Sequence, residues 1–195
     1  MKIIGFVGSS RKNGSTAWTV NKILEGARQA GAETQAWYSS ETDIKPCIGC
    51  RKCVEKDRCV IDDDMQQIYN ALKQADAVVL GSPIYMGQMS GQTKVFTDRL
   101  FAQITPHFSP HFKEENAGKK LVLVFTQGNP DASRFQPYYD YTKSMFQILE
   151  FDMRDMVIVT GTRSEHASAK EGLQEKLKNI GADLISNCPP PNKWC

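Results

Sequence analysis

The feature that most constrains the fold is a repeated pattern of a short apolar run, a loop and a segment with helical periodicity. The run at residues 2–7 leads into a polar loop at 8–16 and then into a helical pattern at 17–30. The runs at 75–80 and 120–126 are apolar over most of their length, which is typical of parallel strands covered by helices on both faces. This alternation predicts a doubly wound α/β sheet.

The whole chain follows the pattern, and we expect five strands alternating with five helices. The expected strands are residues 2–7, 33–38, 75–80, 120–126 and 153–160. The expected helices are residues 17–30, 62–74, 92–103, 134–149 and 167–186. The length of 195 residues suits one domain, which we place at 1–187, followed by an extended proline-bearing tail at 188–195.

Charge and hydropathy exclude several classes of protein. The 24 basic and 22 acidic residues are scattered and give a net charge of +2, so no surface for nucleic acid is predicted. No apolar stretch approaches the roughly 20 residues of a membrane-spanning helix. The apolar run at the N-terminus is also too short for a signal peptide. We therefore expect a cytoplasmic protein that binds neither nucleic acid nor a membrane.

The loop at residues 8–16 has the composition of a site for an anion. It joins a strand to a helix N-terminus, where unpaired backbone N–H groups and the helix dipole favour phosphate. The side-chain donors are those of Ser9, Ser10, Arg11, Asn13, Ser15 and Thr16. The spacing fits neither a P-loop nor the dinucleotide pattern GxGxxG. Phosphate binding and simple capping of the helix both stay open for this loop taken alone.

Two further loops follow predicted strands. The loop at 81–87 carries an aromatic ring and a thioether between two glycines, so a flat heterocycle could stack there. The alternative is a structural turn with Tyr85 and Met86 packed on the core. The loop at 126–129 could direct backbone donors to the same crevice. The candidate contacts in these loops are Pro83, Ile84, Tyr85, Met86, Gly87, Thr126, Gln127 and Gly128.

Residues 8–16, 81–85 and 94–99 together resemble the flavodoxin-like superfamily of NAD(P)H-dependent FMN reductases, and the resemblance extends over nearly the whole chain. It implies a five-stranded parallel sheet with strand order 2-1-3-4-5. It also implies that FMN is the cofactor, with its phosphate in the first loop and its isoalloxazine ring against residues 83–87. A homodimer or homotetramer is implied as well.

Other conspicuous side chains receive no catalytic role. Lys94 and Asp98 are one helical turn apart, so we assign them, with Arg99, to the structure or to a subunit interface. His107 and His111 do not form a metal-binding spacing with the third histidine.

Four of the six cysteines lie close together in the spacing C-x2-C-x2-C-x5-C. They are Cys47, Cys50, Cys53 and Cys59. Structural disulfides are not expected in the cytoplasm. The short spacers let three thiolates surround one face of a cubane while the longer arm brings the fourth. The four cysteines are therefore candidate ligands of a [4Fe–4S] cluster, with zinc or a thiol patch without metal as alternatives.

This spacing, in a segment at residues 46–60 that follows the second strand, resembles the iron–sulfur flavoprotein branch of the same superfamily. That branch implies electron transfer between FMN and a [4Fe–4S] cluster. The implied electron donor is ferredoxin, as this branch suggests, or NAD(P)H, as the reductase branch suggests, and the acceptor is a small molecule or a protein. Two alternatives are kept: a cluster-free NAD(P)H-dependent FMN or quinone reductase, and a binding module without FMN whose cysteines hold zinc.

Overall fold

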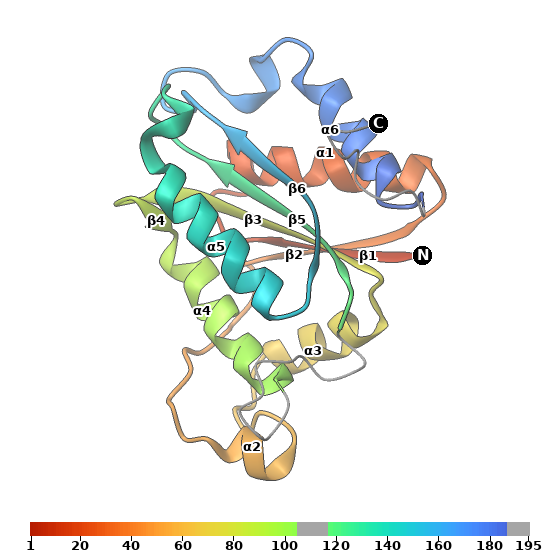
Figure 1. Cartoon of the computed structure of the whole chain (residues 1–195), viewed down its shortest axis with the longest axis vertical. Helices are drawn as coiled ribbons and strands as arrows, with labels where there is room; N and C mark the ends of the chain where they lie inside the picture. The colour runs from red at the N-terminus through yellow and green to blue at the C-terminus, as the bar shows by residue number, and fades with distance from the viewer. Residues whose placement is uncertain (105–116, 187–195) are drawn as a thin grey trace.

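The protein folds around one parallel β-sheet (Figure 1). The computed structural model describes residues 1–104 and 117–186. The parallel strands are β1 (Lys2–Val7), β2 (Glu33–Tyr38), β3 (Ala77–Tyr85), β5 (Lys120–Thr126) and β6 (Asp152–Val159). Their spatial order is β2-β1-β3-β5-β6. Counting parallel strands alone, this order is 2-1-3-4-5, so the predicted flavodoxin-like fold is confirmed.

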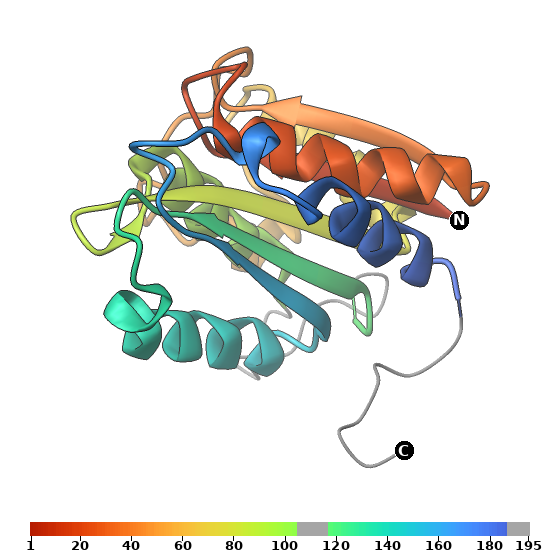
Figure 2. The same cartoon turned by 90° about the horizontal axis from the view of Figure 1, so that it is seen from above.

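Helices cover both faces of the sheet (Figure 2). One face carries α1 (Ser15–Gln29) and α6 (Leu173–Asp183), and the other carries α3 (Met65–Gln74), α4 (Gly91–Arg99) and α5 (Gln136–Ile148). In β1, Ile4 and Phe6 pack with α3, α4 and α5, whereas Ile3 and Val7 pack with α1 and α6. Successive side chains of a strand point to opposite faces, so an apolar strand such as β1 supplies both cores.

The bounds of three strands agree with the prediction, and the largest error lies at the end of β3. That strand was expected to end at Leu80, but it continues to Tyr85. Gly81 is opposite the last residue of β1, while Pro83 still pairs with Thr126 of β5. Pro83 therefore lies where β3 has a neighbour on one side only, a position that tolerates the missing N–H of proline.

Beyond this point β3 turns back into a short antiparallel strand, β4 (Gln88–Met89). The two turn residues, Met86 and Gly87, have φ values of 50° and 82°. Two successive left-handed residues form the tight type I′ turn that suits the twist of a hairpin. The segment predicted as a loop is thus a β-hairpin at the carboxyl edge of the sheet (Figure 1).

Short helical turns account for the remaining differences from the prediction. The short helices are α2 (Lys52–Lys56), η1 (Leu100–Gln103), η3 (Ala132–Phe135) and η4 (Ala167–Ala169). The last helix, predicted as continuous over 167–186, is divided into η4 and α6. Gly172 has a φ of 69° between them, which interrupts the helix.

Two glycines allow α1 and α6 to pack backbone against backbone. A Cβ atom added at Gly181 would lie 1.9 Å from the carbonyl oxygen of Ile23, and one added at Gly26 would lie 2.0 Å from that of Lys178. Neither neighbour can rotate away, because both are main-chain atoms. The second core therefore depends on residues without side chains at this crossing.

Several predictions concern residues outside the described ranges: the tail at 188–195 with Cys188 and Cys195, and the two histidines His107 and His111. Among the helices of residues 1–104 and 117–186, none combines the length and the apolar character needed to cross a membrane.

Replacing Gly181 by alanine should lower the free energy of unfolding by about 2–3 kcal/mol, because the new methyl group forces the two helices apart. Urea unfolding followed by circular dichroism measures the change. Gly91→Ala is the matched control, since no atom lies within 4 Å of its added Cβ, and its effect should stay within about 0.5 kcal/mol. Equal stability of the two variants would contradict the close crossing.

Glu25 should make this helix pair sensitive to acid. Hydrogen bonds from Lys178, at 2.5 Å, and from Lys22, at 2.7 Å, lower the pKa of Glu25 from 4.5 to about 2. Because the folded-state pKa is the lower one, the stabilisation is present above pH 4.5 and is lost as the pH falls towards about 2. The stability difference between the wild type and Glu25→Gln should shrink over this interval in urea titrations. A stability difference between the two proteins that stays constant over this pH interval would contradict the role of Glu25.

Candidate functional site at the carboxyl edge of the sheet

The candidate site is organised around Gly8, the residue that follows β1. Its N–H donates to the carbonyl of Gly81 at 2.8 Å, and its own carbonyl accepts from the hydroxyl of Ser90. A Cβ atom at position 8 would lie 1.8 Å from Oγ1 of Thr93. Glycine is therefore required where the first loop passes over the start of α4.

A network of buried hydroxyl groups lies beneath this contact. Oγ1 of Thr93 donates to Oγ of Ser82 at 2.9 Å, and Oγ of Ser82 also accepts from the N–H of Ser90 at 3.0 Å. Ser90 caps α4 by accepting from the N–H of Thr93 at 3.2 Å. None of these three residues was predicted as part of the site, although a serine just before a predicted helix is a recognisable N-cap signal.

Three serines of the first loop have hydroxyl oxygens that act as acceptors within the protein. Ser9 accepts from the N–H of Arg11 at 3.2 Å, Ser10 from Nε2 of Gln92 at 3.0 Å, and Ser15 from the N–H of Ala167 at 3.1 Å. A hydroxyl that accepts one hydrogen bond keeps its own hydrogen to donate. This donor set suits an anion.

The start of α1 is also suited to negative charge. Among the described residues, no side chain caps its first turn, where Gly14 is the N-cap residue. The hydroxyls of Thr16 and Thr126 are 2.6 Å apart and join this turn to the last residue of β5. The positive end of the helix dipole and the free N–H groups therefore face the region of the first loop.

Exposed side chains of the first loop, including Arg11 and Asn13, line an open hollow of about 360 Å³. Its other wall is the loop after β6, residues 162–166. That loop lies close to the loop after β5, because a Cβ atom at Gly128 would be 3.2 Å from Cβ of Arg163. This wall was not predicted, since no motif marks it and it lies far along the chain from the first loop.

The third loop is shaped by the side chain of Gln127, which is 1% exposed. Its Nε2 donates to the carbonyls of Asn129, at 3.0 Å, and Asp131, at 2.7 Å, while its Oε1 accepts from the hydroxyl of Tyr139. Burial raises the pKa of Tyr139 to about 12, and Tyr138 adds to the increase. Gln127 thus supports the loop, and its predicted contact with FMN stays a prediction.

The predicted ring contacts of the second loop fall into two groups. Pro83 and Ile84 are buried in the sheet, whereas Tyr85 is 50% exposed and Met86 is fully exposed. The alternative that Tyr85 and Met86 pack on the core is therefore wrong. The N–H of Met89 donates to the hydroxyl of Tyr138 at 3.0 Å, which holds the hairpin against α5. A flat ligand would meet the hairpin at its exposed end.

The cysteine segment leaves the sheet after β2 and returns at α3 (Figure 1). Its helix α2 is bounded by Arg51 and Asp57, with φ values of 58° and 56°. Left-handed conformations at residues other than glycine carry local strain. Cys47 and Cys50 are exposed, while the other two cysteines are half-buried against the core beneath α3 and α4.

The pKa of one of the four thiols, that of Cys53, responds to the other three. Burial, followed by the neighbouring thiols of Cys59, Cys47 and Cys50, raises the pKa of Cys53. Even so, no three Cys, His, Asp or Glu side chains are close enough to hold a metal ion in the part of the chain that the structure describes. The donor set suits a thiolate-bound centre, but the structure does not bring the four sulfurs together, and their role as ligands stays a prediction.

Comparison with known proteins adds sequence relatives and a solved structure. An iron-sulfur flavoprotein of Methanocaldococcus jannaschii is 40% identical over 99 residues, which are 51% of each chain. An iron-sulfur flavoprotein of Archaeoglobus fulgidus is 35% identical over 131 residues, 67% of this chain and 58% of the relative. The chain thus spans about half the length of the curated relatives it matches.

The fold has a match in the solved structure of an NAD(P)H:quinone oxidoreductase from Methanothermobacter marburgensis. The TM-score is 0.74 at 13% identity, covering 96% of this chain and 98% of the other. At this identity the likeness concerns the fold alone. The sequence profile described as NADPH-dependent FMN reductase matches residues 1–182, nearly the entire chain. The chain belongs to the NADPH-dependent FMN reductase family.

Proposed function

We propose that this protein is an FMN-dependent oxidoreductase whose cysteine segment holds a second redox centre, a [4Fe–4S] cluster, and that electrons pass between the two. When bound, FMN supplies exchange between two-electron and one-electron chemistry. The donor in this proposal is NAD(P)H or ferredoxin, the acceptor is a small molecule or a protein, and the protein is a homodimer or homotetramer.

The observation that carries the FMN proposal is the uncapped start of α1, surrounded by serine hydroxyls that can still donate. These groups would hold the terminal phosphate, with Arg11 and Asn13 at the rim. The hairpin of β3 and β4 lies at the same edge of the sheet, and its exposed Tyr85 would contact the flavin ring. No side chain is assigned a role as acid or base.

The cluster is supported by the spacing of the four cysteines within one segment. The names of the relatives point the same way. The rival, a cluster-free FMN or quinone reductase, is favoured by the separation of the thiols in the described structure. Thiolates repel one another without a metal ion, so a segment of this kind can close only as it binds one.

Arg11→Ala should weaken FMN binding about tenfold, because a charge-assisted contact to the phosphate is lost. Quenching of flavin fluorescence during titration of the apoprotein measures the affinity. The matched control is Lys12→Ala, which removes an exposed side chain of the same loop that pairs with Glu41 and has no proposed contact with phosphate. An apoprotein with no affinity for FMN would contradict the proposal as a whole.

Anaerobic reconstitution with iron and sulfide should give about four irons per chain and a broad absorbance shoulder in the violet, as expected of a cubane. Cys53→Ser should lose both, whereas Cys188→Ser, outside the segment, should keep them. Flavin absorbance without iron would favour the cluster-free reductase, and a colourless protein with bound zinc would favour the binding module.

A further inference from the structure

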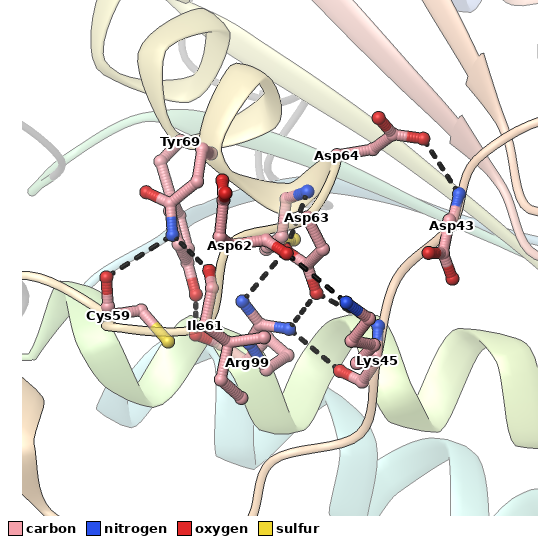
Figure 3. Close-up of polar contacts among 11 residues, drawn as sticks. Asp43, Lys45, Cys59, Ile61, Asp62, Asp63, Asp64, Tyr69 and Arg99 are labelled. Atoms are coloured by element: carbon pink, nitrogen blue, oxygen red, sulfur yellow. Dashed lines mark hydrogen bonds and ion pairs between the residues drawn. The ribbon is translucent and has the colours of Figure 1, made fainter.

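The cysteine segment is closed at its base by contacts between its two ends (Figure 3). On the first side the N–H of Asp43 donates to Oδ2 of Asp64 at 2.7 Å, and the N–H of Lys45 donates to Oδ2 of Asp63 at 2.9 Å. In return, the N–H of Asp64 donates to the carbonyl of Asp43 at 3.2 Å. Residues 43–45 and 62–64 thus form a stem, and the cysteines lie in the loop beyond it.

One side chain from another element spans this stem. Nη1 of Arg99, the last residue of α4, donates to Oδ2 of Asp63 at 2.6 Å and to the carbonyl of Lys45 at 2.7 Å, while Nη2 donates to Oδ1 of Asp63 at 3.1 Å (Figure 3). The exposed fractions of the Arg99 and Asp63 side chains are 1% and 0%. A buried bidentate pair of this kind has a fixed geometry.

Each member of this pair stabilises the charged form of the other, whereas burial alone would favour the neutral forms. Burial disfavours the charged form of Asp63, but hydrogen bonds from Arg99, Lys45 and Met65 hold the pKa of the carboxyl below its usual value. Burial also works against the charge on Arg99, but its hydrogen bonds to Asp63, with the influence of Tyr69 and Cys59, raise its pKa. The guanidinium is therefore a permanent buried positive charge.

The hydrogen bonds to Asp63 and Lys45 do not use every donor of the guanidinium. Nε of Arg99 is buried and has no hydrogen-bond partner among the described residues. The thiol of Cys59 lies near both Arg99 and Tyr69 and contributes to the raised pKa of each (Figure 3). The main chain of Cys59 is held as well, because its carbonyl accepts from Nε2 of Gln66 at 3.2 Å. An unpaired buried donor calls for an explanation, and an anionic sulfur centre at Cys59 would provide one.

We propose that Arg99 is the positioning residue of the cysteine segment: it joins the two ends of the segment through Asp63 and the Lys45 carbonyl, and it offers a buried positive charge to a thiolate-bound centre at Cys59. The second part rests on the proposed function, whereas the first part holds for the protein without metal. Arg99 acts through the segment and touches no reacting group.

The test compares Arg99→Lys with Lys94→Met. Lysine at position 99 keeps the charge but cannot bind Asp63 in two places and the Lys45 carbonyl together. Lys94, on the same helix, forms an exposed ion pair with Asp98 and is the matched control. In the metal-free protein, trypsin should cut Arg99→Lys within the segment, after Arg51, Lys52, Lys56 or Arg58, about tenfold faster than the control. Its FMN affinity should stay within about twofold of the wild type.

Should Arg99→Lys fail to fold, the double variant Arg99→Gln with Asp63→Asn removes both charges together, and the same cleavage is expected. After anaerobic reconstitution, iron per chain should fall below about half of that in Lys94→Met. Wild-type rates of cleavage in both Arg99 variants would overturn the inference. If the Arg99 variants are cleaved faster but the wild type itself binds no iron, the role of Arg99 in joining the two ends of the segment is supported and only the cluster is rejected.

Discussion

The close approach of the main chain at Gly8 to α4 is the constraint on which the rest of the site depends. Because residue 8 has no side chain, its carbonyl accepts from the hydroxyl of Ser90, and its N–H donates to the carbonyl of Gly81. These bonds fix the first loop relative to the second and leave the N-terminus of α1 open beside them. The site is therefore set by main-chain geometry, and hydroxyl groups are arranged around it.

β1 and β5 could be predicted with their observed bounds because apolar runs mark strands that are buried on both faces. β2 was also predicted with its observed bounds, although it is an edge strand whose residues are exposed or half-buried. The end of β3 could not be predicted, since Gly81 and Pro83 are typical of turns. The strand continues past Gly81 because β5 still pairs with it there, whereas β1 has already ended. The break before α6 depends on the left-handed conformation of Gly172, which the hydrophobic periodicity of the sequence does not predict.

The site was predicted less completely than the fold. Local composition pointed to the loop at 8–16, because strand, loop and helix are contiguous there. The supports of the loops come from elsewhere in the chain: Tyr139 holds Gln127, and Arg99 holds Asp63, 36 residues away. Such pairs result from the packing of elements that are distant in the sequence, so no spacing in the sequence predicts them. The i,i+4 pair of Lys94 and Asp98 was found because it is local.

Helix α4 links the two regions of the molecule that carry the proposed chemistry. Ser90, at its start, supports the first loop, and Arg99, at its end, spans the base of the cysteine segment. A helix is stiff, and one inserted residue would rotate everything beyond it by about 100°. Insertion within α4 would carry the guanidinium away from Asp63, whereas added length in the loop past the stem would leave both attachments intact. Tolerance to length change should therefore differ sharply between these two neighbouring parts of the chain.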